Sequence, residues 1–519
     1  MLLTELVETS NAVAETSSRL AKIDRLAELL TRTPADELEL SIAFLTGAPR
    51  QGRIGIAGAA IRSSRDVPPA DHATLHLHEV DEAFEAIATT SGAGSARDRV
   101  QRLRTVLARA THAEQDFLVR LLFGELRQGA LEGILVEAVG RAAGIPSAVI
   151  RRATMLEGAL APVARTAIVN GRSALERFTV HPLRPVQPML ADSSEDVREA
   201  LTELGEAALE YKLDGARIQV HKLEDEVRVF SRALRDVTMA VPEVVERVRS
   251  MASRELILDG EVVAMRPDGS PHPFQVTMRR FGRKLDIEGL RSTLPVTPFF
   301  FDCLYVDGSA LIDDPLSARV DVLGRVAPAD IIVPRLVTAS PDEAVVFVER
   351  ALSLGHEGVM AKVLDAPYAA GRRGHGWLKV KQARALDLVV LAVEWGSGRR
   401  RGLLSNLHLG ARDTERGGFV MLGKTFKGLT DDMLAWQTRK LLELEVARDR
   451  HTVYVRPELV VEIAFNEIQV SPQYPGRLAL RFARVKSHRT DKLASEADSL
   501  LAVQRVYRQM TGLEPPSRA

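Results

Sequence analysis

The chain has 519 residues, and its 69 Lys and Arg residues equal its 69 Asp and Glu residues in number. This length predicts about three domains. The zero net charge excludes a protein that is strongly basic as a whole, as many nucleic-acid-binding proteins are. Positive charge is instead concentrated locally, because the stretch from Arg372 to Arg412 holds nine Lys or Arg against two Asp or Glu. A local basic surface of this kind is sufficient for binding phosphate groups.

The cysteine content and the N-terminus limit the class of protein further. Cys303 is the single cysteine, so the chain can build neither an internal disulfide nor a four-cysteine zinc site, and its apolar neighbours predict that it packs in a core. The first residues include early acids and no basic start, unlike a secretory signal, and no apolar run reaches membrane-spanning length. We therefore expect a soluble, cytoplasmic protein.

The first part of the chain is expected to be helical. Apolar residues recur at helical spacing from Leu20 to Leu30, and further apolar helices are predicted at residues 117–129 and 133–144. Three prolines between residues 181 and 188 then break any helix. These features predict an all-α N-terminal domain over residues 1–175.

The middle part, residues 176–385, mixes β-branched runs with helical segments. Helices are predicted at residues 242–250 and 341–354, and an apolar strand is predicted around Leu256 to Leu258. This mixture is typical of an α+β domain.

Residues 386–519 alternate strands with turns. A helix is predicted from Thr430 to Arg448, with Leu434, Leu441 and Leu442 on its apolar face. Five strands are predicted around this helix, at residues 387–395, 403–411, 418–426, 458–465 and 478–485. Three strands, a helix and two strands are typical of a small Greek-key β-barrel of the OB type.

Residues 210–217, Glu-Tyr-Lys-Leu-Asp-Gly-Ala-Arg, contain the first candidate for catalysis. If the run is a strand entering a turn, Glu210 and Lys212 share a face, and Gly215 lets the backbone bend close to a ligand. Lys212 is a candidate nucleophile, but its amine must lose a proton before it attacks. Because Glu210 and Asp214 oppose this loss, the motif also needs a nearby metal ion or cluster of basic residues. An exposed charged strand is the alternative interpretation.

Six more short motifs follow along the chain. They are Phe230-Ser231-Arg232, Asp259-Gly260-Glu261, Phe299-Phe300-Phe301-Asp302, the segment from Glu357 to Lys362, the segment from Trp377 to Lys381, and the segment from Arg481 to Lys492. In this order the seven motifs resemble those of the covalent nucleotidyltransferases, in which the lysine forms a phosphoramidate with a nucleoside monophosphate. With the helical N-terminal part, the chain most resembles bacterial and archaeal ATP-dependent DNA ligases.

The resemblance implies three domains and one reaction. A helical DNA-binding domain would span residues 1–175, an adenylation domain residues 176–385, and an OB-fold domain residues 386–519. Lys212 would take AMP from ATP, the AMP would pass to the 5′ phosphate of a nick in duplex DNA, and the 3′ hydroxyl would then displace it. The enzyme would act as a monomer in DNA repair, replication or recombination.

The resemblance also implies roles for individual residues. Phe301 would stack on adenine, and Arg217 and Arg232 would reach the ribose and the 5′ phosphate. Lys379 and Lys381, two residues apart on a strand, would face the α-phosphate and lower the pKa of Lys212. The full set of expected nucleotide-binding residues is Glu210, Arg217, Arg232, Glu261, Phe301, Arg372, Lys379 and Lys381. The expected ligands of Mg²⁺, or of Mn²⁺ in its place, are Asp214, Glu261 and Glu357. The residues expected to orient the departing pyrophosphate are Arg481, Arg484, Arg489, Asp491 and Lys492.

Three other functions share parts of this pattern. An mRNA-capping guanylyltransferase has the lysine motif and an OB domain, but the helical N-terminal part and the motifs after Glu357 favour a ligase. An RNA ligase has similar motifs, whereas the length and the N-terminal helices favour duplex DNA, which Arg120 and Arg127 would contact. A non-catalytic DNA-binding scaffold is disfavoured because Lys212, Glu261, Glu357, Lys379 and Lys381 are all present.

Overall fold

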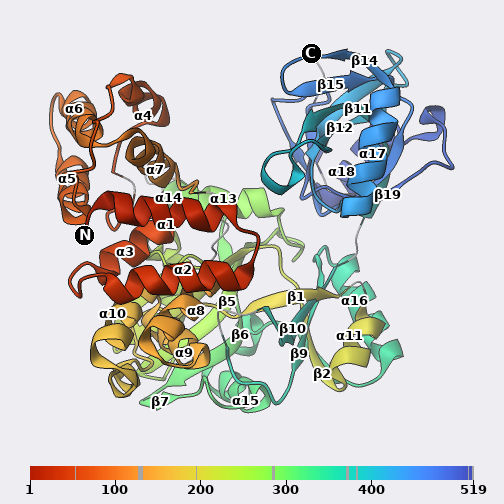
Figure 1. Ribbon diagram of the computed structural model, residues 1–519. Helices are drawn as coiled ribbons and strands as arrows, with labels where there is room; N and C mark the ends of the chain where they lie inside the picture. The colour runs from red at the N-terminus through yellow and green to blue at the C-terminus, as the bar shows by residue number, and fades with distance from the viewer. Residues whose placement is uncertain are drawn as a thin grey trace.

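The protein is described here from a computed structural model, which covers residues 1–52, 54–126, 132–194, 196–282, 287–369, 373–381, 384–511 and 513–516. The chain forms three parts in sequence order (Figure 1): a helical part, a central part with two sheets, and a C-terminal part rich in strands. This confirms the predicted fold class. The predicted domain limits at residues 175 and 385 stay predictions.

The N-terminal part is all-α, as predicted. Its helices are α1 (Leu3–Glu15), α2 (Arg19–Arg32), α3 (Leu38–Leu45), α4 (Gly58–Ser63), α5 (Leu77–Thr89), α6 (Ser95–Arg109), α7 (His112–Phe123), α8 (Glu132–Ala143), α9 (Ser147–Glu157) and α10 (Leu160–Asn170), with short 3₁₀ helices η1 (Ser64–Asp66) and η2 (Arg172–Arg177). Leu26 and Leu30 of α2 are fully buried, as their spacing predicted, whereas Leu20 is exposed.

The helix predicted at residues 117–129 is wrong in extent. Helix α7 already ends at Phe123, because Gly124 adopts a left-handed conformation with φ of 67° and its N–H donates to the Leu121 carbonyl. Glycine takes up such a C-terminal cap without a steric penalty. Residues 127–129 lie outside the described residues, and so does Arg127.

No single helix in the described ranges is long and apolar enough to cross a membrane. Helices α8 and α9 pass the test of length and composition only as a pair, and the chain bends by 120° between them. Both helices bury their apolar residues in the core of the N-terminal part, among them Leu135, Val139 and Ile150.

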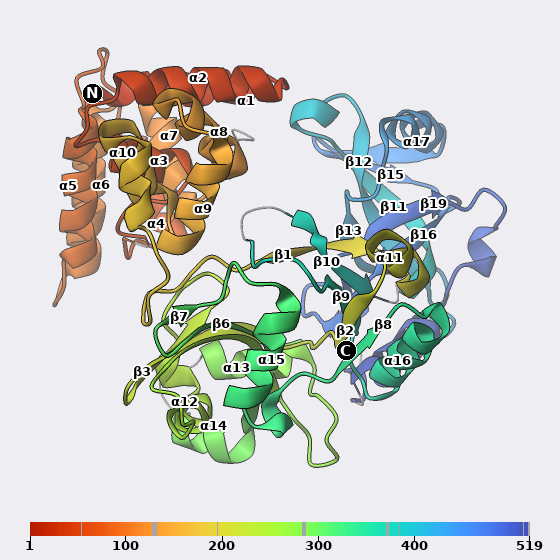
Figure 2. The ribbon, with the colours of Figure 1, turned by 90° about the horizontal axis from the view of Figure 1, so that it is seen from below.

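The central part contains two five-stranded sheets (Figure 2). The first sheet is antiparallel and has the order β4 (Glu226–Ser231), β3 (Ala216–Leu223), β5 (Glu255–Ala264), β6 (Val296–Val306) and β7 (Ser309–Ala310). The second sheet has the order β1 (Leu190–Ser194), β10 (Arg373–Lys381), β9 (Gly358–Val363), β2 (Ala207–Tyr211) and β8 (Arg335–Thr338), and only its β1–β10 pair is parallel.

Helices accompany both sheets. They are α11 (Val197–Leu204), η3 (Thr238–Ala240), α12 (Pro242–Arg249), α13 (Phe274–Gly282), α14 (Ile287–Thr293), α15 (Leu316–Val326), η4 (Ala329–Ile331) and α16 (Pro341–Ser353). The helices predicted at residues 242–250 and 341–354 are confirmed by α12 and α16. Cys303 is fully buried among the apolar residues of the first sheet, as predicted.

The chain crosses from one sheet to the other at the lysine motif. Strand β2 of the second sheet ends at Tyr211, and β3 of the first sheet begins at Ala216. At Gly215 an added Cβ atom would lie 2.3 Å from the carbonyl oxygen of Val262, so only glycine fits at this crossing. Lys212 is therefore held where the two sheets meet.

The C-terminal part is the predicted OB-type barrel. It consists of β11 (Arg384–Trp395), η5 (Gly398–Arg400), β12 (Leu404–Arg412), β13 (Phe419–Thr425), α17 (Asp431–Glu443), β14 (Glu445–Arg448), β15 (Thr452–Val455), β16 (Val460–Phe465), β17 (Glu467–Val470), β18 (Leu478–Arg481), β19 (Arg484–His488), η6 (Ala494–Glu496) and α18 (Leu500–Thr511). The long strand β11 pairs with β12 along one edge and with both β16 and β15 along the other, which curls the sheet around a common core.

Three predictions in this part are wrong. The helix ends at Glu443 rather than Arg448, because residues 445–448 form β14 and pair with β15. Leu442 is 37% exposed, so the buried face of α17 carries Leu434 and Leu441 without it. The strand predicted at residues 478–485 is split into β18 and β19 by Phe482, whose φ of 55° cannot occur within a strand.

Candidate active site

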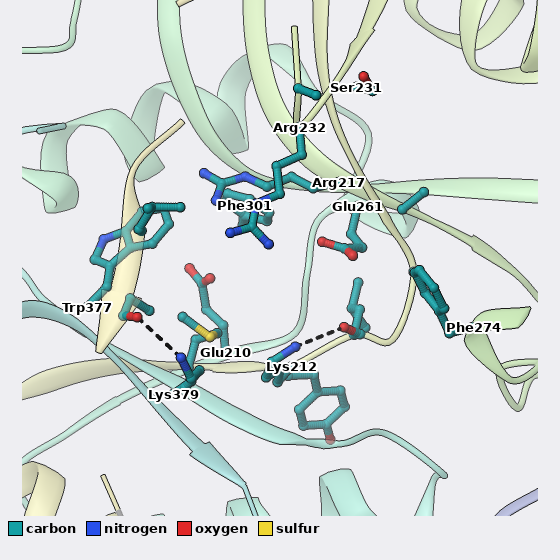
Figure 3. A pocket seen from close by; sticks show the side chains of 18 of the residues that line it. Glu210, Lys212, Arg217, Ser231, Arg232, Glu261, Phe274, Phe301, Trp377 and Lys379 are labelled. Carbon is teal, nitrogen blue, oxygen red and sulfur yellow. Dashed lines mark hydrogen bonds between the residues drawn. The ribbon is translucent and has the colours of Figure 1, made fainter. Parts of the chain in front are cut away.

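A cavity of about 540 Å³ lies between the two central sheets (Figure 3). Strands of both sheets and helix α13 supply its walls, and the lysine motif crosses it. Its lining includes these residues: Glu210, Lys212, Arg217, Arg232, Glu261, Phe274, Phe301, Met360, Lys362, Trp377 and Lys379. Seven of the residues predicted from the sequence to bind nucleotide or to react with it are thus brought into one cavity. Its volume suits a single small ligand.

Lys212 is fixed by contacts of both its backbone and its side chain. Its N–H donates to the Gly358 carbonyl at 2.8 Å, and its carbonyl accepts from the N–H of Glu357 at 3.1 Å. The Nζ atom lies 2.5 Å from Oε2 of Glu357. Burial by itself lowers the pKa of Lys212, but Glu357, Glu261 and Asp214 outweigh burial and raise the pKa above its usual value. Lys212 is therefore an ammonium ion in this structure.

The expected lowering of the Lys212 pKa by Lys379 and Lys381 is outweighed here. Lys381 lies 2.7 Å from the same oxygen of Glu357, whereas Nζ of Lys379 donates to the Ala191 carbonyl at 3.4 Å. The positive charge of Lys381 is thus largely matched by Glu357. The sequence correctly indicated that the carboxylates alone oppose deprotonation and that further positive charge is needed.

Three carboxylates surround Lys212 and differ in charge state. Burial raises the pKa of Glu357, but Lys212 and Lys381 outweigh burial, so its pKa is lowered. Burial raises the pKa of Glu261 to about 7, and burial together with Glu357 and Glu467 raises that of Asp214 to about 6. Within the described residues neither Glu261 nor Asp214 forms an ion pair. Both acids are therefore poised to accept a cation.

No group of three or more His, Cys, Asp or Glu residues within the described ranges is arranged to hold a metal ion. The carboxylates around Lys212 nevertheless fit Mg²⁺, which prefers carboxylate oxygens together with phosphate oxygens and water. These carboxylates define the carboxylate-rich end of the cavity. Asp214, Glu261 and Glu357 supply only oxygen donors, and burial raises the pKa of Asp214 and of Glu261.

The opposite end of the cavity is aromatic. Phe301 meets Trp377 edge to face at 5.9 Å between ring centroids. Arg217 lies 5.5 Å from the Phe301 ring centroid, while its guanidinium donates to both oxygens of Asp259 at 3.1 and 2.7 Å. Phe300, which precedes Phe301, is fully buried in the core. One of three consecutive phenylalanines is thus exposed to the cavity.

Sequence reasoning missed several residues that shape this end. Glu210 is 1% exposed and pairs with Arg335 and Lys362, and the Tyr368 hydroxyl donates to Asp259 at 2.6 Å. Lys362 carried a signal, since it ends one of the seven motifs. Arg335 and Tyr368 carried none, because they meet their partners only through the tertiary fold.

Behind Phe301, Asp302 and Arg319 form a fully buried ion pair, with contacts of 2.7 and 3.0 Å. We expect Asp302→Ala to destabilise the protein by about 3–5 kcal/mol, because it leaves the Arg319 charge buried without a partner. The midpoint of urea unfolding measures this. The exposed pair Arg247–Asp330 in the same part is the control, and Asp330→Ala should change the midpoint little. Equal shifts for both variants would contradict the prediction.

The residues expected to orient pyrophosphate lie on the barrel, and none of them is among the residues that line the cavity. Arg489 and Lys492 both bind Asp387, at 3.2 and 2.5 Å, and Arg489 also binds Asp491 at 2.7 Å. Arg481 pairs with Glu467 at 2.9 Å, and its guanidinium lies 5.4 Å from the ring centroid of the cavity residue Phe274.

Four other residues were predicted to contact nucleotide, pyrophosphate or DNA. Arg484 is exposed on β19, and Arg232 is exposed at the edge of the cavity. Arg372 lies outside the described residues. Arg120, expected to contact DNA, donates to Asn11 and pairs with Asp116 within the helical part.

The three-part fold and the lysine-bearing cavity define a nucleotidyltransferase with a helical domain before it and an OB-type domain after it. Family models match in the same order: "DNA ligase N terminus" over residues 47–140, "ATP dependent DNA ligase domain" over residues 188–381, and "ATP dependent DNA ligase C terminal region" over residues 400–492. The chain belongs to the ATP-dependent DNA ligase family.

Whole-chain relatives agree with this assignment. A probable DNA ligase of Anaeromyxobacter sp. (strain Fw109-5) is 57% identical over 516 residues, covering 99% of both chains. One of Anaeromyxobacter dehalogenans (strain 2CP-1) is 59% identical over 98% of this chain and 100% of the relative. The solved structure "Pmar-Lig_PreS3" covers 93% of this chain and 99% of its own at a TM-score of 0.61, and its 19% identity shows the fold alone. The family assignment favours a DNA ligase over a capping enzyme or an RNA ligase.

Proposed function

We propose that this ATP-dependent DNA ligase seals nicks in duplex DNA through AMP bound covalently to Lys212. The observation that carries the proposal is the position of Lys212, which lies in a cavity between a carboxylate-rich end and an aromatic end. Such a cavity suits a nucleotide, whose base is aromatic and whose phosphates need cations. Glu210, Phe301 and Trp377 would hold the base, and Arg217, Arg232, Lys379 and Lys381 would contact the ribose and phosphates.

The reaction runs in three transfers of a phosphoryl group. The neutral amine of Lys212 attacks the α-phosphorus of ATP, forming a P–N bond and breaking the P–O bond to pyrophosphate. The 5′ phosphate of the nick then attacks this phosphorus, so AMP moves to the DNA and the amine is released. Finally the 3′ hydroxyl attacks the DNA phosphate, forming the phosphodiester and releasing AMP. Each step depends on in-line alignment and on cations around the phosphates.

The first step requires Lys212 to lose a proton that Glu357 now holds in place. Asp214, Glu261 and Glu357 would hold a divalent cation, Mg²⁺ or Mn²⁺, which neutralises carboxylates and binds phosphate oxygens. A cation held there would offset the carboxylate charges that raise the Lys212 pKa. Lys381, which shares Glu357 with Lys212, then repels the Lys212 proton more strongly. Arg372 would add a phosphate contact.

The substrate and the setting complete the proposal. Nicked duplex DNA is the partner that a helical N-terminal domain and a basic barrel surface would enclose, and the enzyme would act as a monomer in the cytoplasm. Of the expected pyrophosphate-orienting residues, Arg481 already lies beside the cavity residue Phe274, and Arg484, Arg489, Asp491 and Lys492 would reach the cavity when the barrel closes over it.

The direct test is the sealing of a 5′-phosphorylated nick with one nucleotide supplied at a time. We expect joining with ATP and not with NAD, and loss of joining when EDTA removes the divalent ion, with recovery on added Mg²⁺. The lysyl-AMP adduct should follow the same dependence on the ion. Joining that depends on NAD, or adduct formation in EDTA, would contradict the proposal.

A further inference from the structure

A buried network of three charged side chains closes the aromatic end of the cavity. Arg335 donates from Nε to Oε1 of Glu210 at 2.9 Å and pairs with the same oxygen through Nη2 at 2.5 Å. Lys362 binds the other oxygen, Oε2, at 2.5 Å. Glu210 and Lys362 are each 1% exposed, yet both line the cavity. The Glu210 carboxylate is thus held from behind by two cations on different oxygens.

The same two cations also fix the aromatic wall. Nζ of Lys362 lies 4.3 Å from the Phe301 ring centroid and 4.1 Å from that of Trp377, and Nη2 of Arg335 donates to the Phe301 carbonyl at 3.1 Å. An ammonium group against two ring faces is favourable and restricts both rings. The carboxylate and the stacking surface are therefore oriented as one unit.

Stability alone does not explain these charges. Burying an ion pair usually gains little over apolar side chains of similar volume, because removing both charges from water costs several kcal/mol per ion. Burial by itself lowers the pKa of Lys362, and Glu210 opposes this effect. The network costs energy at a place that faces a ligand cavity, which is where a functional reason is expected.

The geometry indicates what the network does to a ligand. Oε1 of Glu210 already accepts two hydrogen bonds from Arg335, whereas Oε2, which Lys362 binds, can accept one more because a carboxylate oxygen has two lone pairs. Glu210 extends into the cavity beside Trp377 and toward Phe301 (Figure 3). A purine stacked on Phe301 would turn an edge toward this carboxylate. An exocyclic amino group on that edge donates to it, whereas a carbonyl oxygen is repelled.

We propose that Lys362 and Arg335 are positioning residues that make the cavity select a 6-aminopurine, by holding the Glu210 carboxylate as a fixed hydrogen-bond acceptor. The proposal rests on the proposed function, because it takes the cavity to be the nucleotide site of adduct formation. On this basis ATP should be preferred over GTP, whose 6-oxo group would face the carboxylate. A carboxylate free to rotate would distinguish the two less well.

Rates of adduct formation with ATP and with purine riboside triphosphate, which lacks the 6-amino group, test the proposal. Wild type should favour ATP by about 10- to 100-fold in kcat/KM, as expected for one hydrogen bond to a charged acceptor. Lys362→Met and Arg335→Gln should reduce this ratio toward one, mainly through the KM for ATP. Lys362→Arg keeps the charge and should restore most of the ratio.

Lys222→Met is the matched control, because Lys222 is a buried lysine of the same central part whose Nζ donates to the carbonyls of Arg249 and Met251. It should lower stability and leave the nucleotide ratio at the wild-type value. A wild-type ratio in Lys362→Met and Arg335→Gln would overturn the proposal. If neither variant folds, equal rates for ATP and purine riboside triphosphate in wild type would overturn it. Failure of the proposed function is distinct, since wild type would then form no adduct at all.

Discussion

Replacing Lys212 with alanine is expected to abolish the protein–AMP adduct and to lower nick sealing with ATP by roughly 10³-fold or more, as removal of a nucleophile does in other enzymes. The other amines at the cavity have partners of their own, and Nζ of Lys379 donates to the Ala191 carbonyl at 3.4 Å. Lys381 is paired with Glu357 at 2.7 Å, and Lys362 is paired with Glu210 at the other end. Intact-protein mass spectrometry after incubation with ATP and Mg²⁺ measures the adduct.

Two controls distinguish loss of the reactive amine from loss of its positive charge. Lys212→Arg keeps a cation beside Glu357, but a guanidinium stays protonated in proteins and should form no adduct. Nicked DNA that already carries AMP on its 5′ phosphate bypasses the first two transfers, so Lys212→Ala should seal this substrate far better than it seals an ordinary nick. An adduct in Lys212→Ala, or its mapping to another lysine, would contradict the assignment.

The cavity contains two lysine–glutamate pairs that differ in how firmly they are held. At the aromatic end, Lys362 and Glu210 are 1% exposed, and their pairing is fixed by Arg335 and by two rings. At the phosphate end, Lys212 and Glu357 remain partly accessible, and Glu357 is shared with Lys381. The first arrangement resists change, whereas the second can be broken by a cation. The proposed catalysis would use this difference, because nucleotide binding needs a rigid site while Lys212 must be released from Glu357 before it attacks.

The sequence predicted the architecture and most of the cavity because these depend on local pattern and on motif order. Periodic apolar residues indicated α12, α16 and most barrel strands, and the motifs supplied Lys212, Glu261 and Phe301. Side chains that meet only through the fold were missed: Arg335 lies 125 residues from Glu210, and no spacing rule connects them. Hydrogen-bond partners of this kind become visible only when two distant strands are placed side by side.

The errors in the barrel have a similar cause. Residues 445–448 continue the apolar pattern of α17, and only pairing with β15 makes them a strand. Phe482 separates β18 from β19 because its φ is positive, and a phenylalanine gives no indication of this in the sequence. Short strands such as β14 are decided by their neighbours rather than by their own propensity. The position of the barrel residues relative to the cavity is likewise a property of the whole fold.

Replacing Arg489 or Lys492 with alanine should slow formation of the lysyl-AMP adduct without slowing the final sealing of the nick. Both residues bind Asp387 in this structure and lie outside the cavity lining described above, so they can act on a nucleotide only after the barrel moves. If they stabilise the departing pyrophosphate, each variant should form the lysyl-AMP adduct about 10²- to 10³-fold more slowly, the usual effect of losing one charge-stabilising group. Sealing of a pre-adenylated nick releases no pyrophosphate and should be nearly unchanged.

The matched control is Arg456→Ala, which removes an exposed arginine of the same barrel that pairs with Glu458. It should leave both steps close to wild type. An equal loss in both steps for Arg489→Ala would mean that the residue supports the fold or binds DNA rather than pyrophosphate. Asp387→Asn adds a test with the opposite sign. By weakening the hold on Arg489 and Lys492, it should make the closed state easier to reach and should not slow adduct formation. The expected result is that the alanine variants lose adduct formation alone while Asp387→Asn forms the adduct at an undiminished rate. This result would mean that Asp387 holds Arg489 and Lys492 on the barrel until ATP is bound.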